Sequence, residues 1–361
     1  MKTITLFMLM TIVATSCDTS SNGFDELDAP AVYYGAVSQD SVLCTYKKGN
    51  LSITNNQAID KHSQFALFSI TKTFTAISIM QLVENGRISL DDPAIKHLPQ
   101  YEFLGEITIR QLLTHQSGLN NPIPIRWIHL EEEDGSFDYH RFNSEILKQK
   151  AKVKFEPGKK ASYSNFNFLI LGDIISKVSG LSYQDYIERN VLNTESIGFQ
   201  WNQENTVTGY HDSGFQGWIL GLLLDKSKFT DTKVENLIPF KKAYLNGSAY
   251  GGLLASPNGL NIFLQELLSS ESKILSKEMR NAMFMEQPLS NEKPSGHSLG
   301  WFTGSLSGEK YVHHAGGGGG YYLELRIYPE QGIASYVLTN KSGFSDQRVL
   351  DKLDAQHLNL Y

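Results

Sequence analysis

The sequence predicts an α+β protein in which both ends of the chain build one antiparallel sheet, flanked by helices, around a mostly helical middle part over about residues 87–245. Two observations predict this arrangement. Strand-like alternation with turn residues occupies the two ends, whereas apolar residues at helical spacing occupy the middle. The chain has 361 residues, 41% hydrophobic and 19% charged, which is enough for a sizeable core.

The first 29 residues are expected to lie outside the fold. A basic start and the apolar stretch Ile4–Val13 are typical of an export signal over residues 1–16, and this stretch is too short to span a bilayer permanently. Small residues then precede Cys17, which resembles the lipidated cysteine of bacterial lipoproteins; the alternative is a plain signal peptide cut elsewhere. We therefore expect lipidation of Cys17, a flexible tether over 17–29, and a lipid-anchored protein of the bacterial cell envelope.

The first strands follow this segment. Alternation of apolar and polar residues predicts strands over 32–37, 41–46 and 51–53. Cys44 alternates like a strand residue, so we expect it to be buried and unreactive. With Cys17 acylated, Cys44 is the only cysteine left, and no intrachain disulfide is expected.

Helices are expected to dominate the middle of the chain. The first runs from Ser69 to a stop at Asn85-Gly86. Further apolar runs at helical spacing predict helices over 107–115, 143–152, 165–178, 183–191, 257–268 and 277–285.

The last third of the chain returns to strands and ends in an amphipathic helix over 345–358. The strands are predicted over 299–302, 310–314, 321–328 and 332–339. We expect residues 30–361 to form one domain. The net charge of −6 implies no basic patch, so nucleic acid is not an expected partner, and the sequence leaves the oligomeric state open.

Ser69 and Lys72 form an S-x-x-K motif at the start of the first predicted helix. Residues three apart on a helix share one face, so the lysine amine lies about one turn from the serine. A serine hydroxyl is a poor nucleophile until a neighbouring base takes its proton, and this spacing supplies a base. The alternative is that Ser69 is an ordinary helix N-cap.

The same tetrapeptide also begins at Ser270, Ser290 and Ser307, so its context must choose among the four. Ser290 and Ser307 lie in polar stretches typical of loops, and Ser270 lies in a polar cluster after a helix. Ser69 instead follows an apolar run and opens a strongly apolar helix. Backbone N–H groups at such a helix start favour developing negative charge.

Two later segments carry polar residues suited to the same chemistry. Tyr163 can supply a phenol for proton transfer and Asn165 an amide for a substrate carbonyl; alternatively, Ser162 or Asn165 caps the next helix and Tyr163 only packs. His314 opens a glycine run between two predicted strands. Glycines let a backbone approach a ligand closely, although a bare hairpin loop has the same composition.

Together these motifs resemble the class C β-lactamase-like serine hydrolases, a family that includes DD-peptidases and esterases. The resemblance covers about residues 30–345 and implies a β-lactamase/transpeptidase-like fold, similar to penicillin-binding proteins, with no cofactor and no metal. The segments that carry it are Ser69-Ile-Thr-Lys72, Leu112–Leu119, Pro157-Gly158 with Tyr163-Ser-Asn165, Gly251-Gly-Leu253, and His314–Gly317 with Gly320-Tyr321.

The resemblance also implies roles for the catalytic residues. Ser69 attacks a carbonyl and becomes acylated, and Lys72, whose charge burial disfavours, keeps the serine reactive. Tyr163 passes a proton to the leaving group and activates water in deacylation. Asn165 orients the lysine and the substrate. His115, within the Leu112–Leu119 segment, is expected to be structural.

The glycine-run segment is implied to bind the substrate. The backbone N–H groups of Ser69 and Gly317 form the oxyanion hole, and His314 and Gly316 contribute to substrate binding. His314 stands where enzymes named for β-lactam hydrolysis usually carry lysine. A mostly neutral histidine binds a carboxylate less firmly, which favours peptidase or esterase activity over β-lactamase activity.

One rival nucleophile is rejected. Ser298 lies in Gly296-His-Ser-Leu-Gly300, which matches the G-x-S-x-G elbow, but that elbow needs a buried strand before it and a helix after it. The sequence has neither there. We therefore expect a serine hydrolase that acts on a small-molecule or peptide amide or ester, first a D-alanyl cell-wall peptide; the alternatives are an esterase, a β-lactamase or a non-catalytic penicillin-binding-like sensor.

Overall fold

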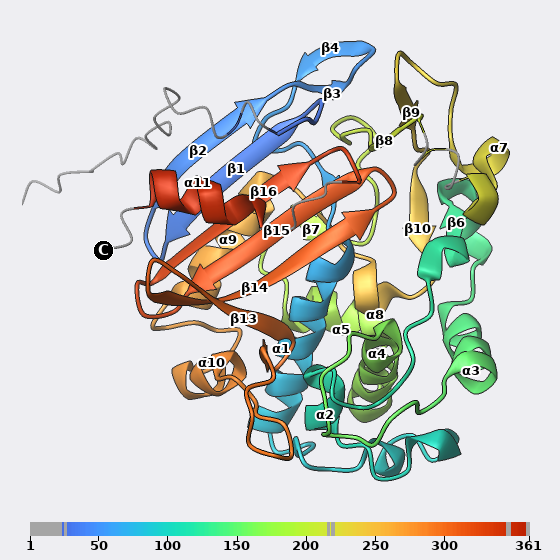
Figure 1. Cartoon of the computed structure of the whole chain (residues 1–361), viewed down its shortest axis with the longest axis vertical. Coiled ribbons are helices and arrows are strands. Elements are labelled where there is room, and N and C mark those ends of the chain that lie inside the picture. Colours follow the sequence, from blue (N-terminus) through green and yellow to red (C-terminus); the bar gives the residue numbers. More distant parts are fainter. Residues whose placement is uncertain (1–23, 25–26, 215–216, 218–220, 344–347, 359–361) are drawn as a thin grey trace, which may run out of the picture.

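The computed structural model describes residues 24, 27–214, 217, 221–343 and 348–358 (Figure 1). Within this part of the chain, seven strands form an antiparallel sheet in the order β12-β13-β14-β15-β16-β1-β2. The strands are β1 (Val32–Ser38), β2 (Val42–Lys48), β12 (His297–Ser298), β13 (Trp301–Leu306), β14 (Glu309–Gly318), β15 (Tyr321–Tyr328) and β16 (Ile333–Thr339).

The two ends of the chain meet in this sheet, as the sequence predicted. Strand β1 lies between β2 and β16, and its register with β16 runs from Val32 opposite Thr339 to Ser38 opposite Ile333. Successive side chains of β1 point to opposite faces of the sheet, so they belong alternately to two apolar clusters, one on each face. Tyr33 belongs to the large core with the helices, and Tyr34 belongs to a smaller cluster under helix α11.

The described helices are α1 (Thr71–Glu84), α2 (Ile109–Leu113), α3 (Tyr139–Lys150), α4 (Asn165–Ser179), α5 (Tyr183–Asn190), α7 (Lys226–Phe229), α8 (Ser248–Gly251), α9 (Pro257–Leu268), α10 (Lys277–Phe284) and α11 (Val349–His357). The short α7 and α8 were not predicted from the sequence, and the others agree with the prediction to within about four residues at each end. Helices α1 and α4 are almost wholly apolar and pack against each other in the core. Figure 1 shows α11 on one face of the sheet. Helix α9 contacts β1 and β16 on the face that carries the large core.

Short strands frame the middle of the molecule. They are β3 (Asn50–Ser52), β4 (Asn55–Ala58), β5 (Phe65–Ala66), β6 (Ile128–Leu130), β7 (Ile197–Gly198), β8 (Tyr210–Asp212), β9 (Leu237–Pro239), β10 (Ala243–Leu245) and β11 (Leu254–Ala255). The sequence prediction missed most of them because two- and three-residue strands carry no alternation to recognise. The pairs β6–β10 and β8–β9 lie together at the upper right of Figure 1.

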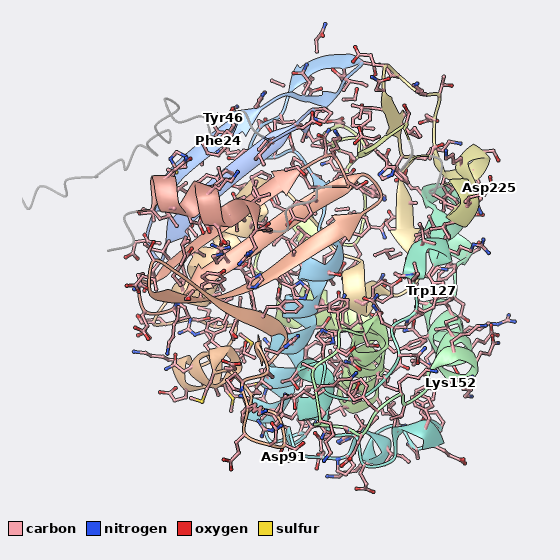
Figure 2. The ribbon with its side chains drawn as sticks, viewed as in Figure 1. Phe24, Tyr46, Asp91, Trp127, Lys152 and Asp225 are labelled. Carbon is pink, nitrogen blue, oxygen red and sulfur yellow. The ribbon has the colours of Figure 1, made fainter. Side chains whose placement is uncertain are left out.

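The expected tether is wrong in its C-terminal part. Phe24 and Leu27 are buried, and the Phe24 ring stacks on Tyr46 of β2 with 3.8 Å between centroids, as Figure 2 shows. Asp28 also accepts an ion pair from Lys341 at 2.6 Å. The fold therefore begins before residue 30, because apolar residues within the polar stretch have a sheet surface to cover. The expected signal peptide and Cys17 lie outside the described residues.

Cys44 is buried on β2, as expected, but the expectation that no intrachain disulfide forms is wrong. Cys44 is disulfide-bonded in the structure. No helix in the described part of the chain is long and apolar enough to cross a membrane.

The glycine run is also more ordered than a hairpin loop. Gly316, Gly317 and Gly318 continue strand β14 and pair with Leu323, Tyr322 and Tyr321 of β15. Only Gly319 and Gly320, which have positive φ angles, form the turn.

Candidate active site

Ser69 lies where the central helix begins. A short 3-10 helix, η1 (Phe68–Ile70), carries it directly into α1. The residue before it, Phe68, has a left-handed φ of 45°, which is a strained conformation for a bulky residue and is typical of functional sites. The side chain of Ser69 makes no N-cap hydrogen bond in η1 or α1, so the N-cap alternative is not what the structure shows.

Lys72 lies one helical turn after Ser69 and is fully buried. Its Nζ lies 2.9 Å from Ser69 Oγ and donates to the carbonyl oxygen of Tyr250 at 2.7 Å. Burial, with no carboxylate to compensate, lowers the pKa of Lys72 well below its ordinary value. This lowering of the pKa favours the neutral amine, whose lone pair can accept the proton of the serine hydroxyl.

Tyr163 reaches the same serine from a different segment. Its hydroxyl lies 2.7 Å from Ser69 Oγ, and Lys72 Nζ lies 5.0 Å from the centroid of its ring. Burial raises the pKa of Tyr163. The phenol thus stays protonated at neutral pH, which leaves Lys72 as the group able to accept the serine proton.

His115 holds the Tyr163 segment in place, as expected of a structural residue. Its carbonyl accepts from the N–H of Ser162 at 2.8 Å, and its ring Nδ1 accepts from the N–H of Ser164 at 3.2 Å. The His115 ring also packs against Tyr163, with 4.6 Å between centroids. Burial lowers the pKa of His115, so the ring is neutral and Nδ1 is free to accept.

Asn165 lies in the site, but it does not orient the lysine. Its Nδ2 donates to Asn121 Oδ1 at 3.2 Å, and its buried Oδ1 has no hydrogen-bond partner among the described residues. The carbonyl of Tyr250 orients Lys72 instead. This residue was missed because a backbone carbonyl leaves no trace in residue type; the only hint was the Gly251-Gly252 that follows it.

The glycines of β14 bring the sheet against the nucleophile. A Cβ on Gly316 would lie 2.2 Å from the carbonyl oxygen of Leu67 and 3.3 Å from the nitrogen of Ser69, so only glycine permits this approach. Gly316 therefore acts in packing and does not line the cavity, whereas Gly317 does line it. The pairing of β13 with β14 ends at His313. The glycine segment of β14 that follows contacts η1.

His314 lies behind the cavity wall and not in it. The side chain is 2% exposed, and its Nδ1 lies 2.8 Å from the carbonyl oxygen of Ala315. Burial lowers the pKa of His314 well below its ordinary value, so the ring carries no charge. The expected contact of this side chain with substrate is therefore absent from the structure.

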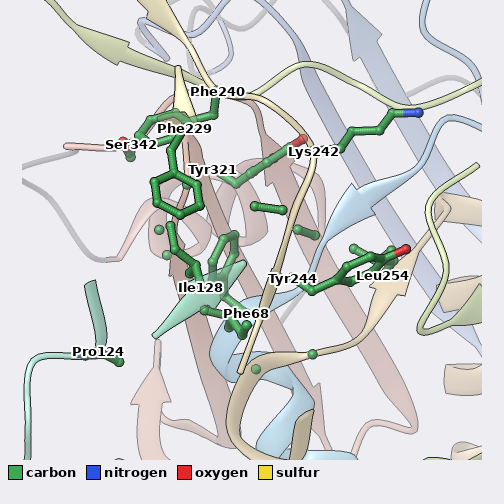
Figure 3. Close-up of a pocket in the computed structure, with 18 of the residues that line it drawn as sticks. Phe68, Pro124, Ile128, Phe229, Phe240, Lys242, Tyr244, Leu254, Tyr321 and Ser342 are labelled. Carbon is green, nitrogen blue, oxygen red and sulfur yellow. The ribbon is translucent and has the colours of Figure 1, made fainter. Parts of the chain in front are cut away.

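Ser69, Tyr163, Asn165 and Gly317 open into one cavity of about 560 Å³, whose walls are shown in Figure 3. The segments 123–128 and 201–245 supply much of its lining. The rival nucleophile Ser298 is fully buried on β12 and does not line this cavity.

The chain is similar to known proteins in sequence and in fold. Residues 23–359 match the family model described as Beta-lactamase. Penicillin-binding protein 4* of Bacillus subtilis is 25% identical over 334 residues, which are 88% of this chain and 69% of that protein. Protein flp of Staphylococcus aureus is 25% identical over 82% of this chain. The matched region is only 56% of the length of protein flp.

Solved structures extend the comparison. The octameric penicillin-binding protein homologue from Pyrococcus abyssi superposes with a TM-score of 0.73 and 26% identity, over 92% of this chain and 75% of that one. A D-stereospecific amidohydrolase from Streptomyces has the same fold, with a TM-score of 0.70 and 23% identity over 92% and 95% of the two chains. From the family match over nearly the whole described sequence, we conclude that the chain belongs to the beta-lactamase family.

Proposed function

We propose that the protein is a serine hydrolase that cleaves an amide or ester through an acyl-enzyme on Ser69. The observation that carries this proposal is the row of three groups at the cavity wall. Lys72 Nζ, Ser69 Oγ and the Tyr163 hydroxyl follow one another at 2.9 and 2.7 Å. A nucleophile within hydrogen-bond reach of a base and of a proton donor is the arrangement that acyl transfer requires.

Acylation uses both neighbours of the serine. The neutral Lys72 amine takes the proton of Ser69 as Oγ bonds to the substrate carbonyl carbon. Tyr163 gives its phenolic proton to the leaving nitrogen or oxygen as that bond breaks. The site then holds an acyl-serine, a lysine ammonium and a tyrosine phenolate, and these two opposite charges lie close enough to stabilise each other.

Deacylation reverses these proton transfers. A water molecule gives a proton to the Tyr163 phenolate as its oxygen attacks the acyl carbon. Ser69 leaves and takes back the proton held by Lys72. Every group returns to its starting state, so no cofactor takes part in this scheme.

The oxyanion that forms at each step needs donors. The N–H groups of Ser69 and Gly317 are the proposed pair. Their nearness is supported by the close approach of β14 to η1 at Gly316. Both residues also line the cavity, where a substrate carbonyl is accessible to them.

His314 is an uncharged histidine where enzymes named for β-lactam hydrolysis usually carry lysine, which favours substrates without a carboxylate next to the scissile bond. The buried His314 offers no positive charge to such a group. We therefore rank amide and ester hydrolysis above β-lactam hydrolysis; the Streptomyces relative is named as a D-stereospecific amidohydrolase. A D-alanyl cell-wall peptide stays a candidate, since the family includes penicillin-binding proteins.

Labelling with a fluorophosphonate probe tests the nucleophile. We expect one adduct per chain, located on Ser69 by peptide mass spectrometry and absent in Ser69→Ala. Ser298→Ala is the matched control, because it removes the buried serine of the rival motif. Labelling that persists in Ser69→Ala would contradict the assignment, and a chain that no probe labels would instead be a binding protein with this fold.

A further inference from the structure

The cavity beside Ser69 is much larger and more apolar than a D-alanyl group requires. Its volume of about 560 Å³ is typical of pockets that enclose a drug-sized ligand. The walls beyond the serine are built from aromatic and aliphatic side chains that come from well-separated parts of the chain, and Figure 3 labels them. They are Phe68, Ile128, Phe229, Phe240, Leu254 and Tyr321.

The outer wall is an apolar cluster in its own right. Leu130, Leu224 and Phe229 form it, and Ile128 and Phe240 pack against it. It is separate from the main core, so these apolar side chains serve the cavity wall rather than the interior of the domain. Apolar surface arranged in this way favours an apolar ligand group, because binding removes both surfaces from water.

Exposed apolar side chains lie in the two segments that supply this wall, over 123–128 and 222–224. Ile123 lines the cavity while 75% exposed, and Leu222 and Leu223, next to the cavity residue Leu224, are 59% and 37% exposed. Arg126 joins the two segments by donating to the Leu223 carbonyl at 2.9 Å. Apolar residues gathered at the rim of a cavity mark a binding surface rather than ordinary solvent-exposed positions.

The position of Tyr163 indicates which part of the substrate occupies the apolar cavity. The rings packed around it, those of His115, Phe302 and His314, do not line the cavity. In the proposed mechanism Tyr163 protonates the leaving group, so the leaving group lies on this side. The acyl group then points the other way, past Phe68 and into the apolar cavity.

We propose that this site is selective for esters or amides whose acyl group is a long apolar chain, which the cavity from Phe68 to Phe240 encloses. This inference rests on the proposed function and names its substrate class. The chain enters past the exposed residues of the rim and replaces water along the wall. The carbonyl carbon stays at Ser69.

Hydrolysis of p-nitrophenyl esters from acetate to dodecanoate, all with one leaving group, tests this selectivity. Burial of each methylene strengthens binding by at most about fourfold, so we expect kcat/KM to rise by about tenfold or more from acetate to octanoate. An equal or falling value along the series, with acetate still hydrolysed, would overturn the inference and leave the proposed function standing. A chain that hydrolyses no ester and whose Ser69 takes no label would overturn the proposed function itself.

A second series of alkyl acetates, with the chain on the alcohol, tests the direction. We expect no rise along this series; a rise here and none among the acyl esters would place the chain on the leaving-group side and overturn the assignment. Labelling of Ser69 by ethyl and octyl fluorophosphonates gives the same comparison without turnover. The octyl probe is expected to react faster.

The wall is tested by Phe240→Asp, which places a charge in the cavity. We expect kcat/KM for the octanoate ester to fall until it is about equal to kcat/KM for the acetate ester. Phe240→Leu should retain the preference. Phe103→Asp is the matched control, because Phe103 is a partly buried aromatic of η3 (Glu102–Leu104) that does not line the cavity. A preference that survives Phe240→Asp with acetate hydrolysis intact would contradict the wall assignment.

Discussion

A fully buried lysine next to a serine is the chemical centre of this protein. No carboxylate among the described residues pairs with Lys72; its polar neighbours are Ser69 Oγ and the Tyr250 carbonyl. A buried amine without a counter-charge releases its proton more easily. The site thus uses burial to prepare a base, and burial keeps the Tyr163 phenol protonated as a donor.

The lowered pKa of Lys72 predicts how acylation depends on pH. Below its lowered pKa, Lys72 is an ammonium and cannot accept the Ser69 proton, so the rate of fluorophosphonate labelling should rise with pH through that pKa and then level off. The plateau should be reached well below 10.5, the ordinary value for lysine. Labelling rates measured over a pH series give the midpoint.

Tyr163→Phe is the control for this pH profile. It should lower turnover by roughly a hundredfold or more, since it removes a proton donor, while leaving the midpoint of labelling in place. Lys72→Met should remove the pH-dependent phase. A midpoint near 10.5 in the unchanged protein would contradict a neutral Lys72.

The chemical state of Cys17 and Cys44 can be tested directly. They are the two cysteines of the chain, and one sulfur cannot carry both a lipid thioether and a disulfide. A lipid on Cys17 and the disulfide at Cys44 are therefore alternatives. If Cys17 is lipidated, the intact mass of the membrane-extracted protein includes the lipid, and Cys44 reacts with a thiol reagent after unfolding. The mass of an unmodified chain with no titratable thiol would contradict lipidation and agree with the disulfide at Cys44.

At the scale of elements, the site depends on how closely β14 approaches η1. Gly316→Ala would place a methyl carbon 2.2 Å from the Leu67 carbonyl, so the strand must move away from Ser69. A displacement of about 1 Å costs roughly a hundredfold in rate. We expect kcat/KM to fall by that order, while circular dichroism still shows a folded protein.

Gly198→Ala is the matched control, because Gly198 is also a strand glycine and a Cβ there meets nothing within 4 Å. It should leave kcat/KM unchanged. Equal effects of the two substitutions would mean that the approach at Gly316 does not matter for the chemistry.

The elements also show what a sequence can and cannot predict. Helix α9 has the predicted bounds, and α1 and α4 differ little, because long apolar periods leave one solution. Ser69, Lys72 and Tyr163 came together as predicted. The Tyr250 carbonyl and the burial of His314 did not follow from the sequence, since both depend on how distant segments pack rather than on residue type.

At the scale of the whole molecule, a buried polar cluster joins the two ends of the chain. Asp354 of α11 is fully buried and accepts from Tyr34 of β1 at 3.1 Å and from Tyr328 of β15 at 2.8 Å. It also pairs with Arg326 at 3.4 Å. Glu324 of β15 accepts the first N–H groups of α11, so the helix is fixed at both its start and its middle.

Asp354→Ala should therefore destabilise the whole domain. It leaves the buried Arg326 with one carboxylate partner, the partly exposed Asp351, and removes an acceptor from two tyrosines. We expect a loss of about 3 kcal/mol in the free energy of unfolding, measured by denaturant titration. Gln356→Ala, at an exposed position of the same helix, is the control and should change stability little. A loss as small as that of the control would mean that the cluster is dispensable.

The strained Phe68 has a consequence for the order in which the protein fails on heating. Its left-handed backbone persists only while the sheet, through the glycines of β14, holds η1 against the helical part. When that contact loosens, Phe68 relaxes to an ordinary conformation and the serine turns with it, although both halves keep their secondary structure. Heating should thus abolish hydrolytic activity a few degrees below the temperature at which the secondary structure melts, and cooling should restore the activity.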